Sequence, residues 1–295
     1  MKLRINASQM SKMDTCGFAY NAYYRNNLES AVKSVSLAFG DAVHKACTDW
    51  IINRAVGQEA KEPIRSMFER YFTEHTKNST LSYPDKWTER DFRECGLVMV
   101  ERFTTWWIDS GYMPLMGPQG PWVEKMLTAK LGGPGILPNF PSVQIELYGT
   151  PDIIAMDLQG RIFDLDLKTT AAEYDPIYIS NSGQLTMYDI LMDANKAALG
   201  IDRIDGRAFL QLVRRKVSTK GGKGPTLEAP PPSPPATPEQ IEEFKQKILW
   251  TAEDILRERF PRKSHSAFNT PCSLCDVSLL CTKGDMTGQT LRKAA

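Results

Sequence analysis

Residues 148–170 read YGTPDIIAMDLQGRIFDLDLKTT. The pattern predicts two strands joined by a turn at residues 158–160. In the second strand, apolar residues alternate with Asp164 and Asp166, which is typical of a strand with two unlike faces. Lys168 lies on the same face as the two aspartates, because side chains two positions apart in a strand point the same way.

Carboxylates in an otherwise apolar strand are unfavourable unless something pairs with them. A divalent cation is a natural partner, since Mg²⁺ takes oxygen ligands and usually binds one or two carboxylates. Asp152 arrives from the preceding strand as a second carboxylate beside Asp166. With Lys168 next to them, these residues predict metal-assisted phosphodiester hydrolysis. On these residues alone, a hairpin with an exposed acidic face is the alternative.

Three short motifs, in this order along the chain, resemble the PD-(D/E)XK nuclease superfamily in its RecB-like exonuclease branch. The resemblance implies an α/β nuclease core, with a small central mixed sheet flanked by helices, a helical insertion, and a cluster of cysteines that staples the two chain ends together. The motifs are Gly149-x-x-Asp152, Asp166-x-Lys168-Thr169 and Gln184-x-x-x-Tyr188.

The resemblance also implies roles for individual residues. It makes Asp152, Asp166 and the backbone carbonyl of Leu167 ligands of Mg²⁺ or Mn²⁺. It assigns Lys168 to positioning the attacking water and stabilising charge on the phosphate, and Gln184 to orienting the lysine or the substrate. Together, Asp152, Asp166, Lys168 and Gln184 are the predicted catalytic residues.

A helix is expected over residues 36–55, with His44 beside its apolar stripe. Taken alone, this histidine is interpreted as a hydrogen-bonded residue at the edge of the core. The RecB-like branch has Gly-x-x-x-His in this helix, with the histidine as a metal ligand, and Gly40 and His44 match that spacing. Imidazole suits Mn²⁺ as well as softer metals, so the resemblance favours Mn²⁺ beside Mg²⁺.

Another helix is expected from about residue 181 to residue 198, with Asn181 or Ser182 as its cap. Gln184 and Tyr188 are four residues apart, so they share one helix face. An ordinary amphipathic helix is the alternative, whereas the resemblance places Tyr188 on the DNA side.

A strand is expected over residues 207–213, and it runs directly into a local basic run. The formal net charge of the chain is only +1, so any nucleic acid must bind a local patch. Such a run is usually a solvated loop, but beside a phosphate-handling site it predicts contacts with the DNA backbone. The run consists of Arg214, Arg215 and Lys216.

Cysteines near both chain ends indicate a metal or cluster site, since clustered cysteines in a cytosolic chain favour metal ligation over disulfides. Cys16 follows a short helix, for which Ser8 is the expected cap, and is the best fourth ligand for a compact C-terminal trio. Cys47 and Cys95 are better interpreted as small core residues. Four thiolates suit either zinc or an iron–sulfur cluster. The six cysteines stand at 16, 47, 95, 272, 275 and 281.

The one-plus-three cysteine spacing is similar to the 4Fe–4S arrangement of the AddB nuclease domain and of the CRISPR-associated adaptation nucleases. The resemblance implies a structural 4Fe–4S cluster, and joining the chain ends would constrain the unfolded chain by roughly 5 kcal/mol. The family usually has proline after the first cysteine, where this chain has Gly17. The implied ligands are Cys16, Cys272, Cys275 and Cys281.

The 295 residues are expected to form a single nuclease domain, with 42% hydrophobic and 24% charged residues as in ordinary globular proteins. The start of the chain lacks the apolar core of a signal peptide and no apolar run would span a bilayer, so a cytoplasmic location without membrane contact is expected. The expected parts are a helical region (about 30–110), a catalytic core (about 143–216), a Pro-rich spacer (225–238), and a C-terminal helix with the cysteine cluster (239–281).

The expected function is a metal-dependent DNA nuclease, an exonuclease that acts on DNA ends or single strands. One alternative is a nuclease-fold DNA-end-binding or assembly module with weak or no catalysis, against which the complete Asp–Asp–Lys set argues. The other is a zinc-stapled endonuclease. The chain has no Gly-x-x-x-x-Gly-Lys-Ser/Thr loop, so any unwinding partner must be a separate helicase, recombination or CRISPR protein. An oligomer is compatible with the sequence.

Overall fold

The computed structural model describes residues 1–295 except 59–60, 78, 219–223, 264–269 and 293–295. The chain divides into two compact units, each of which gathers segments that are distant in sequence. The predicted single domain over residues 1–295 stays a prediction. The terminal unit comprises Met1–Val32, Thr128–Gly149 and Thr237–Ala295, and the central unit comprises Lys33–Leu127 and Thr150–Ala236.

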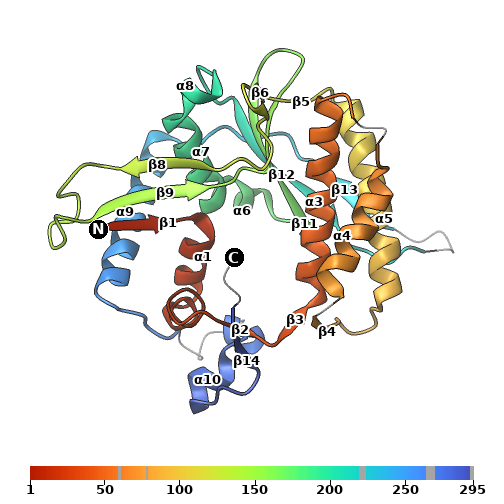
Figure 1. The fold of residues 1–295 in the computed structure, drawn as a ribbon. Helices are drawn as coiled ribbons and strands as arrows, with labels where there is room; N and C mark the ends of the chain where they lie inside the picture. The colour runs from red at the N-terminus through yellow and green to blue at the C-terminus, as the bar shows by residue number, and fades with distance from the viewer. Residues whose placement is uncertain (59–60, 78, 219–223, 264–269, 293–295) are drawn as a thin grey trace. The chain divides into compact units, whose positions relative to one another are not determined.

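The central unit is built on a five-stranded mixed sheet, drawn in Figure 1. Its strands, in spatial order, are β13 (Thr226–Glu228), β12 (Gly206–Val213), β11 (Ile162–Thr170), β10 (Ile153–Met156) and β5 (Met113–Pro114). β10 and β11 form the predicted antiparallel hairpin, and β11 then runs parallel to β12 along its whole length. The predicted small mixed sheet is therefore confirmed.

One face of this sheet is covered by α3 (Val35–Ala55), which packs with α4 (Ile64–Thr76) and α5 (Glu89–Ser110). Leu165 and Leu167 of β11 point into this core. Gly40 of α3 allows a close approach to the sheet, because a Cβ atom there would lie 2.8 Å from Thr169 Oγ1. The predicted helix over residues 36–55 is confirmed.

The opposite face of the sheet is covered by α7 (Gly183–Ala194), where Leu185 packs against Phe209 of β12. Ser182 caps α7, as expected, and accepts a hydrogen bond from the N–H of Leu185. The predicted helix over 181–198 is divided, because α7 ends at Ala194 and a separate α8 (Lys196–Leu199) follows. The short α6 (Pro176–Ser180) precedes α7.

The Pro-rich stretch 225–238 is more than the passive spacer that its composition predicts. Its first part forms β13, which pairs antiparallel with β12 from Gln211↔Glu228 to Val213↔Thr226. Further along, Ser233 bridges Arg207 with two backbone hydrogen bonds. The physical reason is that β12 carries unsatisfied backbone groups on its outer edge, and this segment supplies their partners.

The terminal unit contains a three-stranded sheet of β1 (Lys2–Ile5), β9 (Gln144–Gly149) and β8 (Leu127–Leu131), with β1 parallel to β9. α1 (Ala7–Thr15) is capped by Asn6 in a capping box with Gln9, so the expected Ser8 cap is wrong by two residues. α9 (Pro238–Leu256) also begins with a capping box. The other elements here are α2 (Gly17–Tyr20), η1 (Asn21–Arg25), β2 (Leu28–Ser30), η2 (Pro271–Leu274), α10 (Ser278–Lys283) and β14 (Gln289–Leu291).

None of the described helices is both long enough and apolar enough to cross a bilayer. The remaining elements are short strand pairs. The pairs are β3 (Val32–Ser34) with β4 (Thr80–Ser82), and β6 (Met116–Gly117) with β7 (Gly120–Pro121).

Candidate active site

The site begins where the pairing of β10 with β11 ends, at Ile153↔Leu165. Two residues further along β11, the backbone N–H of Leu167 donates to Oδ2 of Asp152 at 2.7 Å. The N–H and C=O of one strand residue project toward the same edge, so the carbonyl of Leu167 also faces the side where Asp152 lies. Beyond the end of β10, the side chain of Asp152 thus supplies the hydrogen-bond acceptor that a neighbouring strand would otherwise offer to Leu167.

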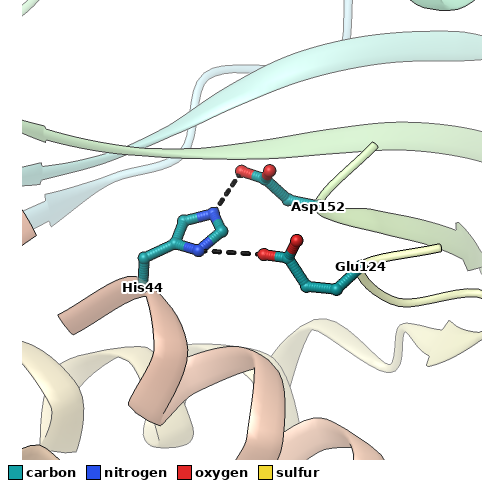
Figure 2. A group of neighbouring side chains, drawn as sticks. All are labelled: His44, Glu124 and Asp152. Atoms are coloured by element: carbon teal, nitrogen blue, oxygen red, sulfur yellow. Dashed lines mark ion pairs between the residues drawn. The ribbon is translucent and has the colours of Figure 1, made fainter. Parts of the chain in front are cut away.

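His44 brings a second element to Asp152, and Figure 2 shows its ring between two carboxylates. His44 Nε2 lies 2.7 Å from Asp152 Oδ2, and His44 Nδ1 lies 3.0 Å from Glu124 Oε1. One ligand atom from each of these three residues falls within 4.8 Å of the others. α3 supplies the histidine, and the connections to β8 and β10 supply the carboxylates.

Glu124 is a functional candidate that sequence reasoning missed. It has a positive φ of 52°, and its N–H donates to the backbone carbonyl of Asp152 at 3.0 Å, which fixes the two residues side by side. The available signal was weak: Glu124 is the only acidic residue between Ser110 and Ser142. No periodic pattern links it to His44, which stands far earlier in the chain.

The two carboxylates determine the protonation of His44. Burial by itself lowers the pKa of His44, but the charge and hydrogen bonds of Asp152 and Glu124 outweigh it and raise the pKa to about 10. Without a metal ion, the imidazole is therefore a cation at neutral pH, and it balances part of the acidic charge around it.

On the other face of the sheet, Lys168 and Asp166 meet Gln184 of α7. Lys168 Nζ lies 2.5 Å from Asp166 Oδ2 and donates to Gln184 Oε1 at 2.8 Å. The amide of Gln184 donates in turn to Asp166 Oδ1 at 2.7 Å. Gln184 therefore bridges the lysine and the carboxylate, and its predicted role in orienting the lysine or the substrate stays a prediction.

The charged groups of this network shift one another's pKa values. Burial and the charge of Asp152 raise the pKa of Asp166 to about 7, against the lowering effect of Lys168. Burial lowers the pKa of Lys168, but Asp166 and Asp152 reverse this effect, so that the net shift is upward. Lys168 is therefore a cation at neutral pH and is unsuited to act as a general base.

The family is decided by the sequence as a whole. The family model of the PD-(D/E)XK nuclease superfamily matches residues 4–282. The chain belongs to the PD-(D/E)XK nuclease superfamily. No curated protein matches this nuclease. Among solved structures, it is similar to one described as "Crystal structure of SSO0001", with 12% identity, 93% of this chain and 94% of that chain covered, and a TM-score of 0.36.

The donor set of this nuclease fits a divalent cation. The His44–Glu124–Asp152 group places one imidazole nitrogen and two carboxylate oxygens together, and such a mixed set suits Mn²⁺ or Mg²⁺. Asp166 has no exposed surface, and its Oδ2 lies 2.5 Å from Lys168 Nζ. A cation between Asp152 and Asp166 would relieve the repulsion that raises the pKa of Asp166.

Tyr188 lies next to Gln184 on α7, as their spacing predicts. Its ring is buried, its hydroxyl donates to the backbone carbonyl of Thr150 at 3.1 Å, and it accepts from the amide of Gln184 at 3.2 Å. In this nuclease the tyrosine therefore holds Gln184 and the chain before Asp152 in place. Its predicted contact with DNA stays a prediction.

The three cations of the predicted DNA-binding run, at residues 214–216, differ in whether they are paired with a carboxylate. Arg215 lies 3.3 Å from Glu173, and Lys216 lies 3.0 Å from Asp91, so both are already paired with carboxylates. Arg214 has no such partner among the described residues, and donates to Ser36 Oγ at 2.6 Å.

The four predicted cluster cysteines all belong to the terminal unit and are free thiols. Cys16 and Cys275 pack against the same small apolar cluster. Burial raises the pKa of the Cys275 thiol, and the charges of Cys16 and Cys272 raise it further, so these sulfurs are neighbours. Cys281 is buried in α10. This set of thiols from both chain ends fits a thiolate-bound group.

Glu146 is the polar face of β9, since it lies 2.5 Å from Lys2 and 2.9 Å from Arg4. Cys47 and Cys95 are fully buried in the helical core, as expected. Gly17, where the family usually has proline, faces Pro261, and a Cβ atom there would lie 2.8 Å from Pro261 Cδ.

Proposed function

We propose that this protein is a metal-dependent nuclease that hydrolyses phosphodiester bonds of DNA, acting as an exonuclease on ends or single strands. The observation that carries the proposal is the convergence of the His44–Glu124–Asp152 group with the Asp166–Lys168–Gln184 network at one end of β11. A binding module with no catalysis would have no use for a lysine held in place by two separate hydrogen-bonding partners.

In the proposed reaction, His44, Glu124, Asp152 and Asp166 would hold Mg²⁺ or Mn²⁺, together with the carbonyl of Leu167. When bound, the metal supplies positive charge to the scissile phosphate and acidifies a water. Lys168 has three N–H donors, of which Asp166 and Gln184 occupy two. The third is free to donate to the attacking water or to a phosphate oxygen, where a fixed cation stabilises the developing charge.

Gln184 and Tyr188 act on the position of Lys168 in this proposal. Gln184 fixes the ammonium group against Asp166, and Tyr188 fixes the amide of Gln184. Preorganised donors of this kind cost no reorganisation when charge develops on the phosphate.

The test is cleavage of end-labelled single- and double-stranded DNA with Mn²⁺ or Mg²⁺ by anaerobically purified protein. Lys168→Ala should reduce the rate by at least about 10²-fold. Lys196→Ala, a matched loss of a lysine of α8 that is paired with Asp193, should cleave nearly as wild type does. Cleavage of linear but not of closed circular DNA would establish the need for an end. DNA binding without cleavage by wild type would instead support a non-catalytic end-binding module.

We further propose that Cys16, Cys272, Cys275 and Cys281 bind a structural 4Fe–4S cluster in the terminal unit. The proposal is supported by four free thiols drawn from both ends of the chain and by the mutual influence of three of them. A cluster here would link α1 to η2 and α10, and would stabilise the unit chiefly by constraining the unfolded chain.

Iron and acid-labile sulfide analysis tests the cluster. Anaerobically purified protein should be brown and contain close to four of each per chain. Cys16→Ser should lose the colour, whereas Cys95→Ala, which changes a buried cysteine of the central unit, should keep it. A colourless wild type with one zinc per chain would overturn this part of the proposal.

A further inference from the structure

A surface pocket of about 440 Å³ opens in the central unit where β11 ends. It begins one residue after Lys168 and lies beside the first turn of α3. Ser36 in that turn precedes His44 by eight residues, a rise of about 12 Å along the helix. We call it the Arg214 pocket, and its lining is Ser36, Phe39, Thr169, Thr170, Ala171, Ala172, Glu173, Tyr174 and Arg214.

The first observation is a guanidinium group that lacks a counter-charge. Arg214 is half-buried and stacks over the rings of Trp87 and Phe92, at 5.1 and 5.0 Å from their centroids. Its one described side-chain hydrogen bond goes to the neutral hydroxyl of Ser36. Burial lowers the pKa of Arg214, with no carboxylate contributing an opposite effect. A partly buried cation usually has an anionic partner, and here the described residues provide none.

The second observation is an unsatisfied hydroxyl in the wall of the pocket. Thr170 is only 8% exposed, and its Oγ1 is buried without a hydrogen-bond partner among the described residues. Buried polar groups are nearly always satisfied, so this hydroxyl is able to make one further hydrogen bond.

The third observation is the start of α3, a helix of 21 residues whose first turn carries Ser36. Helix N-termini favour negative charge, because their first N–H groups have no partner within the helix. The acidic residue of the lining, Glu173, is paired with Arg215 Nη2 at 3.3 Å, so its charge is largely compensated. The uncompensated charge around the pocket is therefore positive.

We propose that the Arg214 pocket binds a phosphate group of the DNA strand that occupies the active site. Arg214 would pair with the phosphate, and Thr170 and Ser36 would supply hydroxyl donors. This inference rests on the proposed nuclease function and adds a second phosphate contact on the far side of Lys168 from the His44–Glu124–Asp152 group. The phosphate is either a terminal phosphate of the strand or an internal one of its backbone.

Fluorescence anisotropy with labelled single strands tests the proposal in EDTA, where no cleavage takes place. Three strands of one sequence are compared: one with a 5′-phosphate, one with a 3′-phosphate and one with hydroxyls at both ends. Arg214→Gln should weaken binding at least about 10-fold and lower the salt slope by about one. The matched control is Arg65→Gln, which removes the same charge from an arginine of α4 that is paired with Glu101 and does not line the pocket, and it should weaken binding less than about 3-fold.

The comparison among strands identifies the source of the phosphate. If a terminal phosphate occupies the pocket, wild type should prefer one phosphorylated strand and Arg214→Gln should lose the preference. If an internal phosphate occupies it, Arg214→Gln should weaken all three strands equally. Either result supports the pocket.

Thr170→Val keeps the shape of the side chain and guards against misfolding of the arginine variant. It removes an unsatisfied hydroxyl, so its Tm should be unchanged or higher, while DNA binding should weaken about 3-fold or more. Wild-type affinity in both Arg214→Gln and Thr170→Val would overturn the pocket alone, provided that wild type binds and cleaves DNA. A wild type that neither binds nor cleaves DNA would overturn both the pocket and the proposed function.

Discussion

α7 places two polar side chains, Gln184 and Asp189, on one face of the central sheet. Each belongs to a buried group of charged residues, and the two groups differ in their balance of positive and negative charge. Near its start, Gln184 contacts Asp166 and Lys168. Further along, Asp189 pairs with Arg207 at 2.6 Å, and both of these residues are only 2% exposed. Both groups bury charge beside the same strands, so their difference shows which one is built for stability and which for chemistry.

The Arg207 group is electrically closed, which means that its positive and negative charges cancel. Its guanidinium also donates to Thr186 Oγ1 and to the backbone carbonyl of Ser180, and Asp189 accepts from the backbone N–H of Ala236. One positive and one negative charge thus join β12, α6, α7 and the segment before α9. Arg207 Nε and Asp189 Oδ1 have no hydrogen-bond partner among the described residues, but the two charges cancel, and the role of the pair is to hold these elements together.

The metal-site group (His44, Glu124, Asp152, Asp166 and Lys168) is electrically open, which means that its negative charges outnumber its permanent positive charges. Asp152, Asp166 and Glu124 face one permanent cation, Lys168, and only protonation of His44 supplies a second. Between the two groups lies Asp164, with no exposed surface and no hydrogen bond to either oxygen among the described residues. Burial and the neighbouring carboxylates raise the pKa of Asp164 far above its usual value, which favours its neutral form. Excess acidic charge is the feature that suits one group to a cation.

Breaking the closed group should have the largest effect on stability. Arg207→Met leaves Asp189 buried without its partner and should lower the free energy of unfolding by about 3–5 kcal/mol. The double variant Arg207→Met/Asp189→Leu should recover most of this loss, because no buried charge remains. Urea unfolding of the three proteins provides the measurement. An Arg207→Met protein as stable as wild type would contradict the structural role.

Breaking the open group should have the opposite profile. Asp166→Asn should reduce cleavage by roughly 10²–10³-fold. Its metal-free stability at pH 8 should equal or exceed that of wild type. The pKa of Asp166 is raised from 3.8 to about 7 in the folded protein, so its ionisation costs stability as pH rises through this window, and asparagine avoids the cost. A marked loss of stability with retained cleavage would reverse the assignment of the two groups.

A smaller effect concerns the proton on His44. Its pKa is raised from 6.5 to about 10 on folding, so its contribution to metal-free stability is fully present below pH 6.5 and is lost as pH rises toward 10. A metal ligand must be a neutral imidazole, so Mn²⁺ binding at pH 8.5 should release close to one proton per chain. Calorimetry in buffers of different ionisation enthalpy measures this number.

His44→Gln provides the control for this prediction. It should release fewer protons on binding Mn²⁺, and its stability should fall less steeply than that of wild type between pH 6.5 and pH 10. Equal proton release by the two proteins would show that His44 is not a ligand.

Local pattern was sufficient to predict the hairpin of β10 and β11, the α3 and α7 helices and the position of Lys168 on the same strand face as Asp166. These features depend on alternation and helical spacing over a few residues. The pattern failed for β13, because proline content describes local stiffness and carries no information on which sheet edge needs a partner. It also failed for Glu124, since a single carboxylate in an irregular segment has no periodicity.

The sequence by itself determined the family, the catalytic strand and the side chains that face one another across one or two turns, because these follow from covalent order and the fixed geometry of helices and strands. Only the tertiary structure decided charge balance. It brought Glu124 to His44 and paired Arg207 with Asp189. It also gave Arg215 and Lys216 carboxylate partners, whereas Arg214 has none among the described residues. Electrostatic energies depend on distances and burial in three dimensions, and the linear order of residues contains neither.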